Sequence, residues 1–454
     1  MKLFKFILII FTSIIICQKE KLQIVNVDNP YFKPKETKNL VFAFSHMTSG
    51  ASSPCYGLNG YYTDVFDQKW DGFCELTKKG FFQLFQLGRI YQQRFHKLLN
   101  LSEPDISKVR SFASQANKTL MSSNALFYGM YYNKETPVDE QITISVRNFK
   151  NSTLNELIPI FYYTESSNCK GWKKIVEGNI KKNEKEINEH LTKFIHRYKD
   201  IFDSFIYEER IINSNSLYEK VNTFCSGYIS NYYDDRCPNI DILTNLNYTQ
   251  EQFYNVYYDC LELNLYRYLN IEYGGEAQKV PMIVLADLIN DLLFYMDEII
   301  KNPDNPRYIS YFGHDSTMAG VQIILEKAFN IPPKMMHFAS NQFFLLYKVS
   351  DNENEIDKNY NVKYFFNDQL LFTLGYDEFK KNILNIMKNE NDLELFCEGL
   401  KSYDYVMLGL CCTIVILFFA IISICCYHRN IIFNKKVYIS LKEEPKEKSV
   451  EIKN

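Results

Sequence analysis

The dipeptide His314-Asp315 carries the most chemical potential in this sequence. It lies in the run YFGHDSTMAG, from Tyr311 to Gly320, where the apolar pattern predicts that a strand ends and a helix begins. Ligands of α/β proteins bind where strands end, and the free N–H groups of a helix N-terminus attract anions. A histidine at such a place can bind a phosphate oxygen, and a neighbouring carboxylic acid can protonate a leaving group. The simpler alternative is that Asp315 only caps the helix.

The elements that must position this dipeptide alternate between strands and helices. Short buried strands are predicted at 40–47, 108–112, 307–312 and 343–349, and helices at 76–99, 119–130, 280–300 and 315–329. Thr77 suits the N-cap of the first helix. This alternation predicts an α/β core over about 37–150 and 275–375, with a mostly parallel sheet flanked by helices. Residues 155–270 show charged helical stretches without strand alternation, and we expect an inserted, mainly helical subdomain there.

Three stretches resemble one known family. The first is CELTKKGFFQLFQLGRIYQQRFHKLL (74–99), the second VRSFASQANKTLMSSNALFYGMY (109–131) and the third GHDSTMAGVQIILEKAFNIPP (313–333). Together they are similar to the motifs of the histidine acid phosphatases, the branch that includes the prostatic and lysosomal types. The resemblance runs through most of 37–350, and the helical insert lies where that family has its α domain.

The resemblance implies hydrolysis of phosphate monoesters at acidic pH through a phosphohistidine, without a metal or other cofactor. In the family's first motif, R-H-G-x-R-x-P, the histidine attacks phosphorus and both arginines bind phosphoryl oxygens. Without gaps, this motif aligns with TSGASSP, from Thr48 to Pro54, which keeps Gly50 and Pro54. Ser49 then stands at the nucleophile position, and Thr48 and Ser52 stand where the arginines would be.

An alternative register makes His46 the nucleophile. It needs a three-residue insertion, still supplies neither arginine, and places His46 at odd spacing from Ser49 in a continuing strand. The resemblance further implies that Arg110 and His314 bind phosphate and that Asp315 is the proton donor. Lys118-Thr119 stands at the family's R-T, a milder change.

These substitutions favour a phosphatase whose activity is impaired. Losing a hydrolase nucleophile can lower the rate about 10⁶-fold, and losing one preorganised donor costs roughly 10²–10³-fold. A serine without a neighbouring base is a poor replacement. The alternative is an inactive pseudophosphatase that acts as a surface or vesicular binding protein. A phosphorylated small molecule or protein is the expected partner, and a homodimer is possible.

Both ends of the chain carry targeting features. Residues 1–17 have a basic start and an apolar run, which predicts a signal peptide. Residues 405–427 form a run of 23 residues without a charge, long enough at ~1.5 Å per residue to cross a bilayer. Basic residues follow in 428–454, which predicts a cytoplasmic tail and a type I orientation for the ectodomain 18–404. The cell surface and a lysosomal or vesicle membrane both fit.

Cysteines and sequons agree with a luminal ectodomain. Cys55–Cys74 and Cys225–Cys237 are the local disulfide candidates, and the spacings are poor for zinc. The glycosylation candidates are Asn100, Asn117, Asn151 and Asn247. The formal net charge of −3, with an excess of positive charge at both ends of the chain, excludes a nucleic-acid binder with a basic face.

Overall fold

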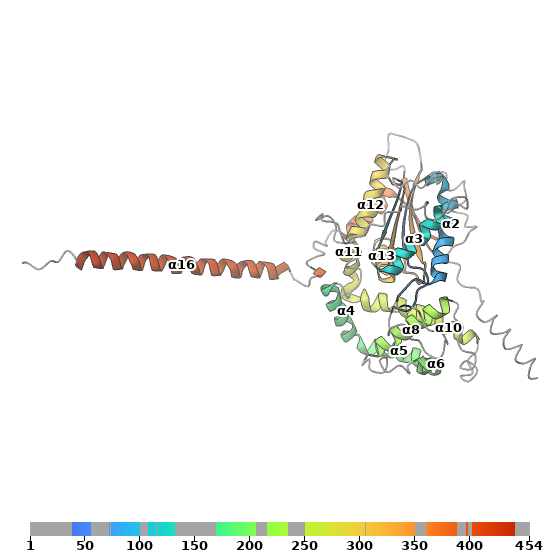
Figure 1. The fold of residues 1–454 in the computed structure, drawn as a ribbon, viewed down its shortest axis with the longest axis horizontal. Helices are drawn as coiled ribbons and strands as arrows, with labels where there is room; N and C mark the ends of the chain where they lie inside the picture. The colour runs from blue at the N-terminus through green and yellow to red at the C-terminus, as the bar shows by residue number, and fades with distance from the viewer. Residues whose placement is uncertain are drawn as a thin grey trace, which may run out of the picture. The chain divides into compact units, whose positions relative to one another are not determined.

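The computed structural model describes most of the ectodomain core, the helical insert and the C-terminal helix (Figure 1). The described residues are 39–55, 72, 74–99, 108–114, 116–131, 169–205, 216–234, 250–304, 306–349, 360–387, 396–397 and 402–440. The expected signal peptide and the sequons at Asn100, Asn151 and Asn247 lie outside these ranges.

Six strands form one sheet in the order β2-β3-β1-β4-β5-β6. They are β1 (Leu40–Thr48), β2 (Val109–Ala113), β3 (Tyr308–Gly313), β4 (Asn341–Lys348), β5 (Tyr360–Phe366) and β6 (Gln369–Gly375). The α/β class is confirmed. The sheet is mixed, however, because only β2, β3 and β1 are parallel, and β4 to β6 continue antiparallel from β1. Antiparallel neighbours need only short turns, whereas parallel ones need crossover helices.

The last two strands, β5 and β6, were not predicted from the sequence. They are joined by a tight turn in which Asn367 and Asp368 both have positive φ, at 44° and 64°. Such a turn matches the twist of a hairpin and favours Asn and Asp. The Asn-Asp pair between two apolar runs is the sequence signal that identifies this hairpin.

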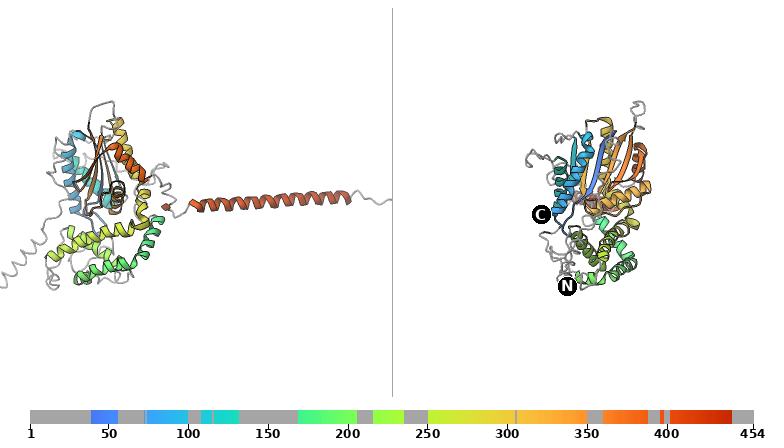
Figure 2. Two further views of the ribbon diagram at one scale, coloured as in Figure 1. Left: turned by 180° about the vertical axis from the view of Figure 1, so that it is seen from behind. Right: turned by 90° about the vertical axis from the view of Figure 1, so that its right-hand side faces the viewer.

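Helices cover both faces of the sheet (Figures 1 and 2). The helices α2 (Lys78–Leu99) and α3 (Asn117–Tyr131) share one hydrophobic cluster with β1, through Ala43 and Met47. The opposite face holds α12 (Ala286–Lys301), α13 (Asp315–Phe329) and α14 (Tyr376–Met387). The single helix expected over 280–300 is divided at Leu285 into α11 (Val280–Val284) and α12.

The helices α2 and α3 cross at very short range. A Cβ on Gly88 would lie 2.0 Å from the carbonyl oxygen of Leu126, and one on Gly129 would lie 2.0 Å from that of Phe85. Only glycine permits this approach of two backbones. Thr77 caps α2 as expected, since its Oγ1 accepts from the Gly80 amide at 3.0 Å. The crossing therefore fixes the N-terminus of α3 relative to that of α2.

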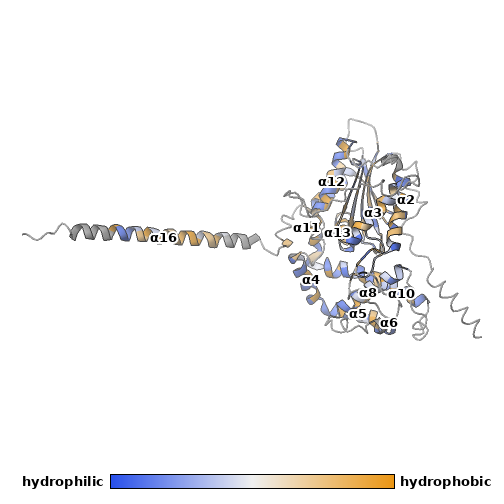
Figure 3. Cartoon of the chain, in the orientation of Figure 1, coloured by the Kyte–Doolittle hydropathy of each residue, from blue (hydrophilic) through white to orange (hydrophobic). Residues whose placement is uncertain are grey.

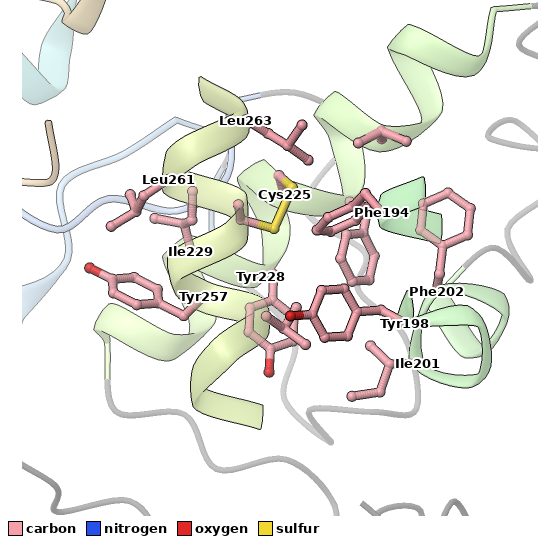
Figure 4. Close-up of a cluster of buried hydrophobic side chains, with 14 of the residues drawn as sticks. Phe194, Tyr198, Ile201, Phe202, Cys225, Tyr228, Ile229, Tyr257, Leu261 and Leu263 are labelled. Carbon is pink, nitrogen blue, oxygen red and sulfur yellow. A yellow bond between two sulfur atoms is a disulfide. The ribbon is translucent and has the colours of Figure 1, made fainter. Parts of the chain in front are cut away.

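The insert is helical in all its described parts, in agreement with the expectation for 155–270. It contains α4 (Lys170–Lys182), α5 (Glu184–Arg197), α6 (Lys199–Phe205), α8 (Leu217–Tyr233) and α10 (Gln250–Tyr266). A π-helical turn (Arg267–Glu272) and a 3₁₀ turn (Gly275–Lys279) lead back to the core. Aromatic side chains of α5, α6, α8 and α10 form its hydrophobic centre (Figure 4).

One disulfide prediction is correct and the other is wrong. Cys55 pairs with Cys74 as expected. Cys225 pairs with Cys260 rather than with Cys237, which lies outside the described residues. Cys225 lies on α8 and Cys260 on α10, and the packing of these two helices brings both sulfurs into the insert core (Figure 4). Sequence proximity favoured the nearer cysteine, but helix packing decides the pair.

The insert packs on the loop that follows β1. Ala51 belongs to the insert's hydrophobic cluster, together with the partly buried Phe338. At the other end of the insert, the Tyr273 hydroxyl donates to the carbonyl oxygen of Ser316 at 2.8 Å. The carboxyl ends of β1 and β3 are therefore covered by the insert.

The C-terminal helix α16 (Ser402–Ser440) belongs to a separate compact unit, 394–454. Its stretch Gly409–Ile431 is long and apolar enough to cross a membrane, and it is the one such helix among the described residues (Figure 3). The span expected at 405–427 overlaps this stretch. The helix continues as far as Ser440, well into the expected tail.

Candidate active site

Two parallel strands bring the first and third motifs together. Thr48, the last residue of β1, pairs with Gly313, the last residue of β3. The residues that follow, Ser49 and His314, therefore leave the sheet side by side. His314 is the N-cap of α13 with extended backbone, and Asp315 is the first helical residue. Asp315 is thus not the cap itself, and the free N–H groups of α13 begin at this edge of the sheet.

The loop after β1 is held by hydrogen bonds from several elements. The Ser49 carbonyl accepts from the Ala339 amide at 2.8 Å, and the Gly50 amide donates to Ser122 Oγ at 3.1 Å. The Ala51 amide donates to Gln83 Oε1 at 2.9 Å. A Cβ on Gly50 would lie 2.4 Å from the carbonyl oxygen of Gly80, so the glycine that the motif keeps is required by close packing on α2.

The two positions where the family has arginines carry buried hydroxyls. Thr48 Oγ1 donates to the carbonyl oxygen of His337 at 3.1 Å, so this hydroxyl is directed into the turn before β4. Ser52 Oγ is buried and has no hydrogen-bond partner among the described residues. Ser49 is 5% exposed. None of the three side chains brings a positive charge to the strand ends.

His46 lies inside β1, paired with Tyr311 on β3 and Gln342 on β4. Its Nδ1 lies 2.7 Å from Gln342 Nε2, and the Tyr364 hydroxyl donates to Gln342 Oε1 at 2.9 Å. The tyrosine fixes the amide so that Gln342 Nε2 donates to Nδ1, which leaves the ring proton on Nε2. In this tautomer the lone pair of Nδ1 accepts the hydrogen bond from Gln342, and Nε2 carries the proton. Neither nitrogen of His46 can then attack phosphorus.

The same histidine is strongly perturbed. Burial, followed by the proximity of His314, lowers the pKa of His46 to about 3. Its Nε2 is buried without a hydrogen-bond partner among the described residues. His46 is therefore a neutral strand histidine packed beneath the site, and it is near enough to His314 to sense that ring electrostatically.

The structure does not bring Arg110 to this site. Arg110 is the second residue of β2, pairs with Ile309, and is exposed. His314 lies five residues beyond Ile309, which corresponds to roughly 16 Å along the strand direction. The Arg110 guanidinium instead donates to the Tyr295 hydroxyl on α12 at 3.2 Å. Arg110, which the resemblance implied as a phosphate ligand, therefore lies along β2 and away from the strand ends.

The cation that reaches the site is Lys118, at the N-terminus of α3. Its ammonium lies 3.0 Å from Cys55 Sγ, in the loop after β1. Its positive charge also acts on both His314 and Asp315. A second cation comes from the insert: Arg267 is 6% exposed, forms an ion pair with Glu272, and acts on Asp315. The match of Lys118 to the family's R-T was the available sequence signal, whereas Arg267 had none.

The electrostatics of the dipeptide suit binding of an anion and donation of a proton. Burial, assisted by Lys118, lowers the pKa of His314 to about 3, so its imidazole is neutral. Burial raises the pKa of Asp315, and the charges of Lys118 and Arg267 partly oppose this. Asp315 therefore keeps its proton to higher pH than an ordinary aspartate, as a general acid requires. The N–H groups of α13 and the Lys118 ammonium can bind phosphoryl oxygens.

The sequon residue Asn117 borders this site. It is the first residue of α3, and its Nδ2 donates to Glu75 Oε2 at 2.9 Å in an exposed position. A glycan on Asn117 would start one residue from Lys118.

Comparisons with known proteins agree with the geometry. Residues 18–367 match the histidine phosphatase superfamily (branch 2). Prostatic acid phosphatase of Homo sapiens is 24% identical over 337 residues, 71% of this chain and 79% of that protein. The Citrobacter braakii phytase structure has a TM-score of 0.51 at 12% identity and covers 77% of this chain and 98% of its own. The Klebsiella sp ASR1 phytase has a TM-score of 0.53 at 13% identity and covers 78% and 95%. The structural neighbours share the fold, and the matched region shows that this chain belongs to the histidine phosphatase superfamily, branch 2.

Proposed function

We propose that this protein binds phosphate monoesters at the carboxyl ends of β1 and β3 and does not hydrolyse them efficiently. Lys118, His314 and the N-terminus of α13 hold the phosphoryl group, and Asp315 lies where a leaving oxygen would depart. The ligand is a phosphorylated small molecule or protein, and the match to an acid phosphatase supports a phosphate ester.

One observation supports this proposal: Thr48 pairs with Gly313, so the residues that follow these two strand ends are Ser49 and His314 rather than two histidines. A serine hydroxyl needs an adjacent base to attack phosphorus. Two buried histidines near this loop have ring nitrogens in hydrogen bonds: Nδ1 of His46 with Gln342, and Nδ1 of His337 with the Phe338 carbonyl. His314 is neutral, but as the phosphate ligand its nitrogen would be engaged with the substrate. The loss of two arginines removes further transition-state stabilisation.

The proposal is tested by measuring binding and hydrolysis on the same sample. Calorimetry of the purified full chain with inorganic phosphate at pH 5.5 should show millimolar binding that Lys118→Met weakens. Hydrolysis of an aryl phosphate by that sample should stay near the buffer rate. Binding that is unaffected by both Lys118→Met and His314→Ala would show that the site lies elsewhere.

A second candidate is hydrolysis through His46. The observation in its favour is that Nε2 of His46 is buried without a partner among the described residues, close enough to His314 for the two rings to interact. A change of tautomer, with Gln342 turned over, would free Nε2 as a nucleophile. In that case His46→Ala would abolish hydrolysis and Ser49→Ala would not.

We also propose a type I membrane orientation. The apolar stretch Gly409–Ile431 and the basic residues that follow it support this orientation. Protease treatment of intact vesicles should remove an epitope placed after 441 and spare the ectodomain. Digestion of the ectodomain in intact vesicles would contradict this orientation.

A further inference from the structure

The helix α16 carries two pairs of adjacent cysteines. The first pair, Cys411-Cys412, lies near the start of the apolar stretch Gly409–Ile431, and the second pair, Cys425-Cys426, lies near its end. All of these thiols are free and exposed on the helix surface. The described cysteines of the ectodomain are disulfide-bonded, in contrast. Among the described residues, the free thiols are therefore those of α16.

The two pairs differ in their distance from the nearest charge. Arg429 follows Cys426 by three residues, which is ~4.5 Å along a helix axis. Asp404 precedes Cys411 by seven residues, which is ~10 Å. Charged side chains are costly in hydrocarbon, so they mark where a spanning helix leaves it. The second pair therefore lies at the edge of the apolar stretch, and the first pair lies deeper within it.

The second pair shares one face of α16 with a cation. The helix runs from Ser402 to Ser440, so Cys425 and Cys426 lie four and three residues before Arg429, spacings that place side chains on the same face. A positive charge there attracts the phosphates of a lipid headgroup or of coenzyme A. On the other side of the pair, the helix is hydrophobic (Figure 3), which suits a fatty acyl chain.

We propose that Cys425 and Cys426 are sites of S-acylation by a long-chain acyl coenzyme A. This inference rests on the proposed type I orientation, which places the second pair at the cytoplasmic surface. Cysteines beside the membrane are acceptors for this modification. The acyl chain enters the hydrocarbon beside α16 and holds this end of the helix at the membrane surface.

The reaction exchanges one thioester for another. The cysteine sulfur attacks the carbonyl carbon of the acyl coenzyme A and forms a new carbon–sulfur bond. The bond from that carbon to the sulfur of coenzyme A breaks, and coenzyme A leaves as a thiol with the proton of the cysteine. No oxidant or reductant is consumed.

Two double variants locate the modification. The full chain is expressed in eukaryotic cells, its free thiols are blocked with N-ethylmaleimide, and thioesters are cleaved with neutral hydroxylamine. The released thiols are then labelled with maleimide-polyethylene glycol and counted by gel shift. Wild type and Cys411→Ala/Cys412→Ala should gain one label for each acylated cysteine, and Cys425→Ala/Cys426→Ala should gain none. A wild type without hydroxylamine-dependent label, or a label that follows the first pair, would overturn the proposal.

The same samples test whether the second pair instead crosslinks two copies of the chain. A dimer that dithiothreitol dissolves and that Cys425→Ala/Cys426→Ala lacks, without any hydroxylamine-dependent label, would assign the pair to an intermolecular disulfide and contradict acylation. Both double variants should stay in the membrane fraction during alkaline carbonate extraction, because alanine keeps the apolar stretch intact. Loss of label is then not loss of insertion.

Protease treatment of the intact vesicles separates failure of this inference from failure of the orientation. If the tail is digested and the ectodomain is spared, an unlabelled second pair overturns acylation alone. If the ectodomain is digested, the type I orientation is wrong. The first pair would then lie nearer the cytoplasm, and the inference would fail together with the orientation.

Discussion

Thr48 and Gly313 are directly paired across the parallel strands β1 and β3, so Ser49 and His314 leave the sheet together. If the first motif is aligned without gaps, its nucleophile position falls on Ser49, which follows the strand end that is paired with the end of β3. His46 lies three residues earlier, inside the strand and bonded to Gln342.

The first prediction concerns the identity of the binding cation. Lys118→Met should weaken binding of inorganic phosphate about 10- to 100-fold, because it removes a charge-assisted hydrogen bond from a partly buried site. Arg110→Met is the matched control: it removes a cation of the same sequence segment that lies far along β2, and it should change the affinity less than 2-fold (about 0.4 kcal/mol). Calorimetry measures both. A larger loss of phosphate affinity for Arg110→Met than for Lys118→Met would instead support Arg110 as the phosphate ligand, as the motif implied.

The second prediction concerns repair of the first motif. The triple variant Thr48→Arg, Ser49→His, Ser52→Arg should raise hydrolysis of an aryl phosphate at least ~10³-fold over the unmodified protein, because it restores a nucleophile and two donors. Adding Asp315→Ala should slow substrates with poor leaving groups most, since it removes the proton donor. Steady-state rates across a series of aryl phosphates test this. A triple variant that folds and still binds phosphate, but does not turn over, would contradict the role of Ser49.

The third prediction concerns stability in acid. Burial lowers the pKa of His46 and of His314 to about 3, whereas both protonate near 6.5 in an unfolded chain. As pH falls below about 6.5, the unfolded state takes up protons that the folded state does not. The free energy of unfolding should therefore fall by about 1.4 kcal/mol per pH unit for each histidine, until about pH 3. Asp315, with its raised pKa, acts in the opposite direction and gains stability as pH falls through the folded pKa.

Urea denaturation at pH 7.5 and 5.5 measures this dependence. His46→Gln should reduce the loss of stability between these pH values by about 1 kcal/mol. His196→Gln, at an exposed position on α5, is the control and should leave the loss unchanged. An identical loss in wild type and His46→Gln would mean that His46 is not buried as a neutral ring.

The fourth prediction concerns the crossing of α2 and α3. Gly88→Ala places a Cβ 2.0 Å from the Leu126 carbonyl oxygen and should lower the free energy of unfolding by about 1–3 kcal/mol. Gly178→Ala on α4 meets no atom within 4 Å and should raise it by about 0.5–1 kcal/mol through helix propensity. Thermal and urea unfolding distinguish the two. Because the crossing positions the start of α3, Gly88→Ala should also weaken phosphate binding. An unchanged phosphate affinity would show that the helix crossing does not position the binding site.

Local patterns predicted the strand–helix junction at His314 well, because a buried strand, a capping position and an amphipathic helix are all encoded within a few residues. The helix predicted at 315–329 matches α13 at both ends. The distinction between Arg110 and Lys118 could not be predicted in this way. It depends on the register of β2 against β3, and a motif gives the order of residues but not the distance of each from the strand ends.

Tertiary packing also decided two other features. Cys225 pairs with Cys260 because α8 and α10 pack against each other, which no cysteine spacing reveals. Arg267 reaches Asp315 from the π-helical turn that ends α10, across a sequence separation of nearly 50 residues. Contacts between helices that are far apart in the sequence depend on the shape and burial of both partners. The local sequence pattern of one helix does not reveal them.

The most direct test of the central claim is the rate of aryl phosphate hydrolysis at pH 5 by the unmodified full chain, measured beside His46→Ala and Ser49→Ala. With a serine in the nucleophile position, we predict turnover below about 10⁻³ s⁻¹, compared with 1–10³ s⁻¹ for typical enzymes, and no further loss in either variant. Turnover of about 1 s⁻¹ or more that His46→Ala abolishes and Ser49→Ala does not would contradict the account and identify His46 as the nucleophile.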